Sequence, residues 1–283
     1  METRPTHRIG IMQGRLLPRV GDRVQAFPGP LWPTEFTLAA ELGYEAMELT
    51  IENASLETHP LLSPQGRRQI RDTAAAAGIH LAGLCCDTVM ETPLIGPDEH
   101  KRASALETTM ALIRASAEAG LPMVELPMMG ENSLRHDGAY DRMAAVLDHL
   151  LPLADQLGIL ILLEVDVPPA DIRRFLERVD HPRFGINYDS GNSTWFGYEP
   201  EDEIPVYAHW IGNVHVKDCT RKDYSVPLGS GETRLDDVFR LLLTAGYAGD
   251  FILQAARQAD DVAAARDYLT VVRQTLTNAR NSP

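Results

Sequence analysis

The sequence predicts a closed barrel of eight parallel β-strands, each followed by a helical segment. Three observations support this α/β fold class, the (β/α)8 or TIM barrel. The apolar pattern alternates between short strand-like runs and longer helical periods. Eight such units fit into 283 residues, a length typical of this barrel. No change in composition marks a second domain, so we expect residues 1–283 to form a single domain.

The expected strands are short runs of aliphatic residues bounded by turn or helix signals. In chain order they cover residues 7–15, 45–52, 80–87, 122–129, 159–166, 183–191, 211–218 and 250–254. A doubly wound open sheet is the alternative, but it would normally contain fewer units. A G-x-G-x-x-G sequence would also be expected after its first strand, and none is found there.

Helix signals separate the strands. Ser63 and Pro64 form an N-cap followed by a first-turn proline, which predicts a helix from there. Glycines predict three further helix ends, at Gly120, Gly158 and Gly246. The last helix is expected over residues 260–278, and the helical segment after the sixth strand, residues 203–212, is expected to be short and irregular.

Composition narrows the function. The formal net charge of −14 disfavours nucleic acid and anionic membranes as partners. The three cysteines, two of them adjacent, do not make a disulfide framework. The first residues lack the apolar core of a signal peptide, and the longest apolar run is too short to span a membrane. We therefore expect a cytoplasmic protein without membrane contact; a homo-oligomer stays open.

Polar side chains follow the apolar runs of the last four strands. Alternation along each strand places Glu164, Asp189, His215 and Gln254 on the inward face, near the carboxyl end. In a TIM barrel these ends form the mouth where active sites lie. Two carboxylates, an imidazole and an amide oxygen predict a site for one divalent metal ion, with Mn²⁺ or Mg²⁺ favoured and Co²⁺ or Zn²⁺ also compatible.

Further charged residues are expected near this mouth. Arg15, Lys217, Arg221 and Arg257 follow strands one, seven and eight, and on an acidic chain they predict an anionic group on the substrate. The alternative is that some of them pair with local carboxylates. Glu48 and Glu125, in strands two and four, have inward parity and are candidates for substrate binding or for buried ion pairs.

The strand-end motifs also resemble a known family. LLEVD (162–166), NYDSGN (187–192), NVHVKDCTR (213–221) and VPLGSGE (226–232) are similar to segments of the xylose isomerase-like TIM barrel superfamily. The resemblance is to its sugar phosphate isomerase/epimerase group, which includes ketose 3-epimerases, and it extends over essentially the whole chain. It implies metal ligands at Glu164, Asp189 and His215. The fourth ligand, normally a glutamate, falls on Gln254.

The resemblance also implies substrate contacts and a reaction. The implied substrate contacts fall on Arg221, the substrate-binding arginine of the family, and on Asn192, where a histidine is common in the family. The implied reaction is metal-assisted enolisation of a keto sugar, sugar phosphate or related polyol through an enediolate. With Gln254 in place of the second glutamate, we expect Glu164 to be the only carboxylate base at the metal and Lys217 its partner acid.

Three alternatives to an isomerase or epimerase stay open. A lyase or dehydratase acting on a keto-cyclitol or sugar would use the same site, because its reaction also begins with enolisation. A metal-binding barrel with reduced catalysis is compatible with Gln254. A DNA-repair endonuclease of the same superfamily is disfavoured, because it needs further strand-end histidines and the chain is acidic.

Overall fold

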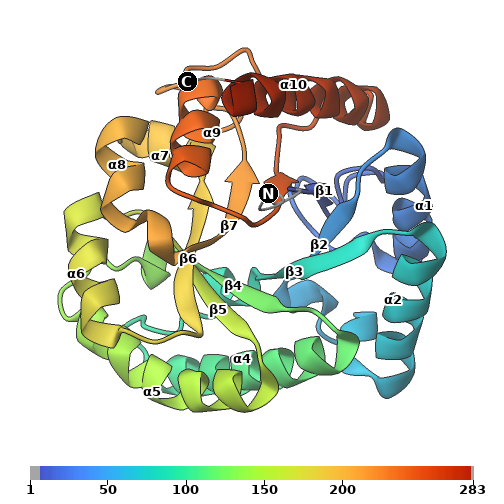
Figure 1. Ribbon diagram of the computed structural model, residues 1–283. Helices are drawn as coiled ribbons and strands as arrows, with labels where there is room; N and C mark the ends of the chain where they lie inside the picture. The colour runs from blue at the N-terminus through green and yellow to red at the C-terminus, as the bar shows by residue number, and fades with distance from the viewer. Residues whose placement is uncertain (1–6, 282–283) are drawn as a thin grey trace, which may run out of the picture.

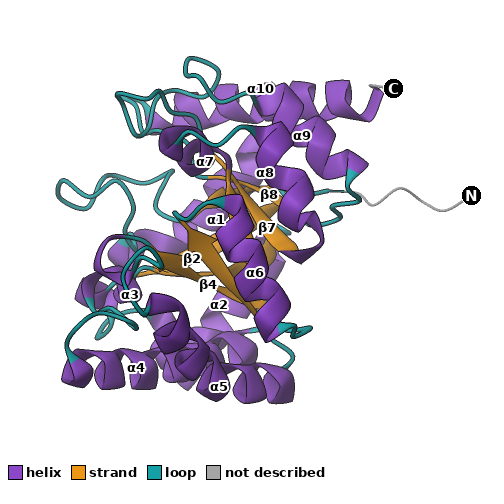
Figure 2. Cartoon of the chain, turned by 90° about the vertical axis from the view of Figure 1, so that its left-hand side faces the viewer, coloured by secondary structure: helices purple, strands orange, loops and turns teal. Residues whose placement is uncertain are grey.

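The computed structural model describes residues 7–281, and in it eight strands close into a barrel. All neighbouring strands are parallel, and β1 pairs with β8 to complete the ring. Figure 1 shows the strands at the centre, with the helices arranged around them. Figure 2, a view from the side, shows the longest loops gathered at one side of the barrel. The predicted fold class is confirmed.

The strands are shorter than the sequence runs that predicted them. Their bounds are Ile9–Met12 (β1), Ala46–Ile51 (β2), His80–Cys86 (β3), Met123–Met128 (β4), Leu160–Val165 (β5), Phe184–Asp189 (β6), Ile211–Val216 (β7) and Phe251–Leu253 (β8). The difference lies mostly at the carboxyl ends, where the chain leaves the sheet to form the loops of the mouth.

The longer helices surround the barrel. Their bounds are Trp32–Leu42 (α1), Pro64–Ala77 (α2), Glu99–Ala119 (α4), Ala139–Leu157 (α5), Pro169–Val179 (α6), Leu235–Thr244 (α9) and Asp261–Asn281 (α10). Ser63 caps α2 as predicted, because its Oγ accepts a hydrogen bond from the N–H of Gly66 at 3.0 Å. Gly120 and Gly158 end α4 and α5 in the left-handed conformation.

Shorter helices differ from the sequence prediction. The segment between β6 and β7 contains two of them, Ser190–Phe196 (α7) and Pro200–Tyr207 (α8), rather than one irregular stretch. A further short helix, Thr88–Glu91 (α3), follows β3 and was not predicted. Single 3₁₀ turns lie at Gly29–Leu31, Asn53–Ser55, Pro60–Leu62, Gly130–Asn132 and Ala208–Trp210.

The core has two parts, which confirm the predicted side-chain parity. Outward-facing residues such as Phe251 and Leu253 pack against the helices in one large cluster. Inward-facing residues fill the barrel in a smaller cluster that consists of Met12, Ala46, Ala82, Cys85 and Ile252. Ile252 therefore has the parity expected for Gln254 two residues later.

None of the helices within residues 7–281 combines the length and the apolar character needed to cross a membrane.

Candidate functional site: a Glu-Asp-His group at the barrel mouth

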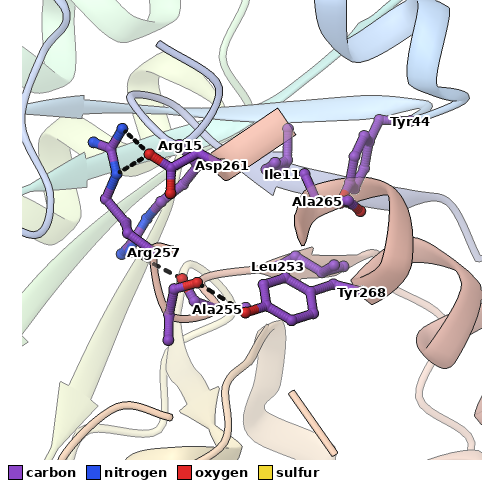
Figure 3. Close-up of a pocket in the computed structure, with 10 residues that line it drawn as sticks. Ile11, Arg15, Tyr44, Leu253, Ala255, Arg257, Asp261, Ala265 and Tyr268 are labelled. Atoms are coloured by element: carbon purple, nitrogen blue, oxygen red, sulfur yellow. Dashed lines mark hydrogen bonds and ion pairs between the residues drawn. The ribbon is translucent and has the colours of Figure 1, made fainter. Parts of the chain in front are cut away.

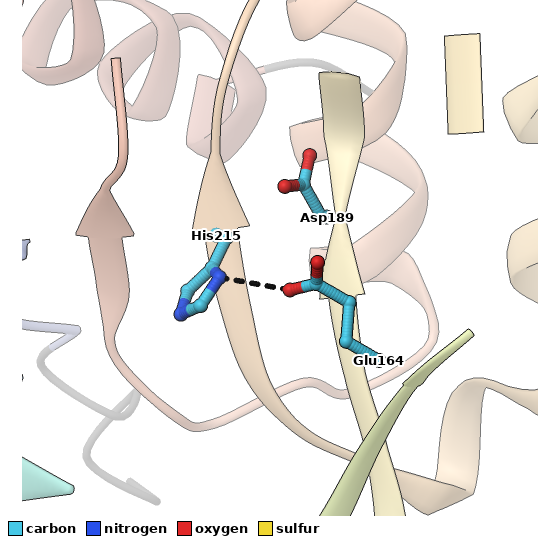
Figure 4. A group of neighbouring side chains, drawn as sticks. All are labelled: Glu164, Asp189 and His215. Atoms are coloured by element: carbon cyan, nitrogen blue, oxygen red, sulfur yellow. Dashed lines mark hydrogen bonds and ion pairs between the residues drawn. The ribbon is translucent and has the colours of Figure 1, made fainter. Parts of the chain in front are cut away.

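Three neighbouring strands bring one ligand-type side chain each to the same point. Glu164 lies near the end of β5, Asp189 ends β6, and His215 lies in β7 beside Asp189 in the strand register. One potential ligand atom from each residue lies within 4.8 Å of the other two, and all three residues are buried. Figure 4 shows the three side chains turned toward one another. The predicted grouping of these residues is therefore present in the structure.

The group fits a divalent ion, judged by its hydrogen bonds. Asp189 uses Oδ1 to accept the N–H of Asn192 at 2.8 Å. Its Oδ2 is buried and has no hydrogen-bond partner among the described residues. Buried polar atoms without partners are rare and costly, so this oxygen calls for a ligand. A carboxylate oxygen beside a second carboxylate and an imidazole is a donor set that divalent metals accept.

Glu48 lies at hydrogen-bond distance from the Nε2 side of the His215 ring. Its Oε2 lies 3.1 Å from His215 Nε2 and accepts a hydrogen bond from Asn213 Nδ2 at 2.9 Å. On the other side of the ring, His215 Nδ1 lies 3.0 Å from Glu164 Oε2. Burial lowers the pKa of His215, but the carboxylates of Glu48 and Glu164 together raise it well above its usual value. Glu48 thus lies where it can orient the imidazole of a metal ligand.

Two asparagines fix the carboxylate of Glu164. Asn187 Nδ2 donates to Oε2 at 2.6 Å, and Asn192 Nδ2 donates to Oε1 at 2.7 Å. Asn192 was predicted to contact the substrate, whereas Asn187 was missed. The signal for Asn187 was its inward parity two residues before Asp189 in β6. With both oxygens accepting hydrogen bonds, Glu164 is held in one orientation.

Lys217 approaches the group from the loop after β7. Its Nζ donates to Asn192 Oδ1 at 2.8 Å, lies 3.9 Å from Asp189 Oδ2, and lies 3.4 Å from the centre of the Tyr224 ring. Burial lowers the pKa of Lys217, although Asp189 and Glu164 oppose the change. Asn192 therefore connects the ammonium group of Lys217 with the carboxylate of Glu164.

A cavity of about 240 Å³ opens beside these residues. The residues lining it are Arg15, Val24, Gln25, Cys85, Asp87, Met90, Glu125, Pro127, Met129, Glu164, Lys217, Tyr224, Ser225 and Gln254. It therefore brings together five of the residues singled out from the sequence. Gln25, Asp87 and Tyr224 were missed: Asp87 directly follows β3, a detectable strand-end signal, whereas Gln25 and Tyr224 lie in loops.

Gln254 enters this cavity from the end of β8. Its Nε2 donates to Gln25 Oε1 at 3.1 Å, so its own carbonyl oxygen is the atom left available for another ligand. The same Oε1 of Gln25 accepts a hydrogen bond from Arg15 Nη2 at 3.0 Å. Metal ligation by Gln254 stays a prediction.

Glu125 lies deeper in the barrel than the metal group. It pairs in register with Leu162, two residues before Glu164. Its two carboxyl oxygens are buried and lack hydrogen-bond partners within the described chain. Burial, together with the negative charge of Glu164, raises the pKa of Glu125 well above its usual value. Substrate binding by Glu125 stays a prediction.

Arg221 and Arg257 lie outside the lining of this cavity. Arg221 is exposed. Arg257 lies beside a separate small pocket between β1, β8 and α10, where it pairs with Asp261 (Figure 3). The Arg257 Nη2–Asp261 Oδ2 distance is 2.7 Å, and Arg257 also donates to the carbonyl of Gly14 at 2.8 Å. The four expected cations thus do not form one cluster.

Sequence comparison agrees with this geometry. The family model described as "Xylose isomerase-like TIM barrel" matches residues 36–274. The chain belongs to this family. Among curated proteins, L-ribulose-5-phosphate 3-epimerase UlaE from Salmonella heidelberg is 23% identical over 254 residues, which cover 85% of this chain and 89% of the relative. The predicted family is confirmed.

Solved structures of two sugar epimerases share the fold of this chain. L-Ribulose 3-epimerase superposes with a TM-score of 0.79 at 16% identity and covers 97% of this chain and 96% of its own. The 3-keto-D-glucoside 4-epimerase YcjR from E. coli gives 0.73 at 19% identity, covering 95% of this chain and 100% of its own. At these identities the similarity shows the fold. Metal identity, cellular location and oligomeric state stay predictions.

Proposed function

We propose that this protein is a divalent-metal-dependent isomerase or epimerase that acts on a keto sugar. The observation that supports it most is the buried group of Glu164, Asp189 and His215 at the edge of a cavity large enough for a small molecule. The family and the relatives, which are named as sugar epimerases, support an enzyme of this class. Because the identity to these relatives is low, the sugar substrate has to be inferred from the cavity of this chain.

Glu164, Asp189 and His215 would hold the ion, and the Gln254 carbonyl is the proposed fourth donor. A divalent ion at this position supplies a Lewis acid that polarises the carbonyl group of the substrate. The oxygen-rich donor set favours Mn²⁺ or Mg²⁺, and the imidazole keeps Co²⁺ and Zn²⁺ compatible.

Glu164 is the proposed base for the C–H proton beside the substrate carbonyl. The amides of Asn187 and Asn192 orient its carboxylate toward one fixed position at the cavity wall. Lys217 is the proposed partner acid, because its Nζ also lines the cavity and lies at hydrogen-bond distance from Asn192. Burial lowers the pKa of Lys217, which makes its ammonium group a better proton donor.

Elimination is the second candidate, and one observation favours it. The family position that normally carries a second glutamate holds Gln254, whose amide cannot accept the substrate proton. Proton removal at one face and protonation of a leaving hydroxyl by Lys217 would then give a dehydratase. The same Glu164 would begin both reactions, so product analysis is needed to separate them.

The test is substrate deuterium exchange in D2O with Mn²⁺ and a panel of ketoses, followed by NMR. We expect exchange beside the carbonyl with wild-type protein, and an epimer, an isomer or an elimination product in the mixture. Glu164→Gln should reduce exchange by roughly 100- to 10,000-fold while Mn²⁺ still binds. Glu107→Gln, the same change on the exposed face of α4, is the matched control. Undiminished exchange in Glu164→Gln would contradict the assignment of the base.

A further inference from the structure

Two of the four cations expected to bind a phosphate, Arg15 and Arg257, are hydrogen-bonded within the protein. Arg257 has a buried side chain that pairs with Asp261 and donates to the Gly14 carbonyl. Arg15 is buried, and its two terminal nitrogens donate to the Ala255 carbonyl and to Gln25 Oε1, both at 3.0 Å. A phosphate needs free donors that face it. Each terminal nitrogen of the two guanidinium groups thus donates at least one hydrogen bond within the protein, while Arg15 Nε has no partner among the described residues.

The glycine loop after β7 is also occupied. In TIM barrels the loops after strands seven and eight frequently bind phosphate through backbone N–H groups. Here the buried carboxylate of Asp218 binds these N–H groups in place of a phosphate. Its Oδ2 accepts hydrogen bonds from Gly229 N at 2.8 Å and from Gly231 N at 2.9 Å. Its Oδ1 accepts from Thr233 N at 3.1 Å. The carboxylate of Asp218 therefore occupies the backbone N–H groups that could otherwise bind a phosphate.

The lining of the cavity that contains Glu164 also contains a second carboxylate, Asp87. Asp87 Oδ2 accepts hydrogen bonds from Gln25 Nε2 at 2.9 Å and Thr50 Oγ1 at 3.0 Å. Within residues 7–281, the one hydrogen-bond donor to Asp87 Oδ1 is the thiol of Cys85 at 3.5 Å, which is a weak donor. Asp87 lines the cavity, so Oδ1 can accept a hydrogen bond from a hydroxyl group. The negative charge of Asp87 opposes a phosphate at the same place.

Gln25 connects Asp87 with Arg15 and Gln254 through hydrogen bonds. Its Oε1 accepts from Arg15 and Gln254, and its Nε2 donates to Asp87. All of its hydrogen-bonding capacity is directed at the protein. Gln25 is therefore a positioning residue that fixes Asp87, and Asp87 is the group left to contact the substrate.

We propose that the cavity accepts an uncharged polyhydroxy ketose and excludes its phosphate ester, with Asp87 recognising one substrate hydroxyl. This inference rests on the proposed function, since it names the substrate class of the same site. It distinguishes this chain from the relative named as an L-ribulose-5-phosphate 3-epimerase.

The experiment measures binding and exchange separately for matched sugar pairs. Calorimetry in the presence of Mn²⁺ gives Kd for L-ribulose, L-ribulose 5-phosphate, D-fructose and D-fructose 6-phosphate, and NMR in D2O gives their exchange rates. We expect the neutral member of a pair to bind at least about tenfold more tightly than its phosphate. Tighter binding of the phosphates, or no binding of any of the four sugars, would overturn the inference.

Two variants test the role of Asp87. Asp87→Asn should weaken binding of the neutral ketose by about 10- to 100-fold and reduce the discrimination against its phosphate. Asp22→Asn is the control, because it makes the same charge change at an exposed position of the Gln25 loop. Equal effects of Asp87→Asn on both members of a pair would contradict the proposal. Preferential binding of neutral ketoses without exchange would contradict the proposed reaction alone and leave this inference standing.

Discussion

The two walls of the cavity are built differently. On the side of β5, β6 and β7, Glu164 lines the cavity, and adjacent strand registers bring Asp189 and His215 beside it. On the other wall, Asp87 follows β3 and is fixed by Gln25, which belongs to a loop more than 60 residues earlier. The comparison indicates that strands position the chemistry, whereas a loop contact positions the group proposed to select the substrate.

The largest expected effect concerns Asp189. Its Oδ2 accepts no hydrogen bond within the described residues and lies in the Glu164–Asp189–His215 group, so Asp189→Asn should weaken Mn²⁺ binding by roughly 100-fold or more. Calorimetric titration with Mn²⁺ measures this, and Asp22→Asn serves as the control for the lost charge. Unchanged affinity would show that Asp189 is not a ligand and would break the description of the β5–β7 wall.

Arg257 should affect stability and leave substrate choice unchanged. Arg257→Met leaves the half-buried carboxylate of Asp261 unpaired, and we expect the free energy of unfolding to fall by about 3 kcal/mol. Arg173→Met removes an exposed pair with Glu177 at the same spacing and should cost no more than about 0.5 kcal/mol. Urea denaturation compares the two variants. A phosphate-specific rise in KM in Arg257→Met would return this arginine to the substrate site.

Glu48 should act on the metal through His215. Glu48→Gln replaces the carboxylate that holds His215 Nε2, and we expect Mn²⁺ affinity to fall by about 10- to 100-fold. Binding of a neutral ketose should weaken only as far as metal occupancy falls. Titration at saturating Mn²⁺ separates the two effects, with Glu107→Gln as control. A rise in ketose Kd that saturating Mn²⁺ does not reverse would indicate direct contact with the substrate.

Gln254 gives the smallest expected effect. Gln254→Glu adds a carboxylate to the ligand set, which should tighten Mn²⁺ binding by roughly tenfold or less. The gain is limited because the variant loses the hydrogen bond that Gln254 donates to Gln25 Oε1. We also expect 3-epimerase activity to appear or increase, measured by product analysis. Gln258→Glu, at an exposed position, is the matched control. Weaker metal binding would argue against ligation by Gln254.

Strand parity explains why much of the fold and of the metal group could be predicted from sequence. Period-two alternation determined which residues of β5 to β8 face inward, and parallel pairing determined that their carboxyl ends meet. Parity does not give depth, however. Glu48 and Glu125 were correctly predicted to face inward, but the register places Glu125 two residues below the level of Glu164, with Glu48 behind His215.

Loop contacts explain what the sequence did not predict. Gln25 forms hydrogen bonds with Arg15, Asp87 and Gln254, which lie up to 229 residues from it along the chain, and no local pattern encodes such contacts. The ion pair of Arg257, in contrast, could have been predicted from the sequence. Asp261 stands four residues later at the start of α10, and that spacing indicates a local ion pair.

The most direct test of the division between the two walls compares Glu164→Gln with Asp87→Asn. For each variant with Mn²⁺ bound, Kd for a neutral ketose and the rate of deuterium exchange at saturating ketose are measured. Glu164→Gln should lose exchange and bind the ketose within about threefold of wild type, whereas Asp87→Asn should lose binding and retain most of the exchange rate at saturation. Equal losses of binding and exchange in both variants would contradict the assignment of chemistry to one wall and recognition to the other.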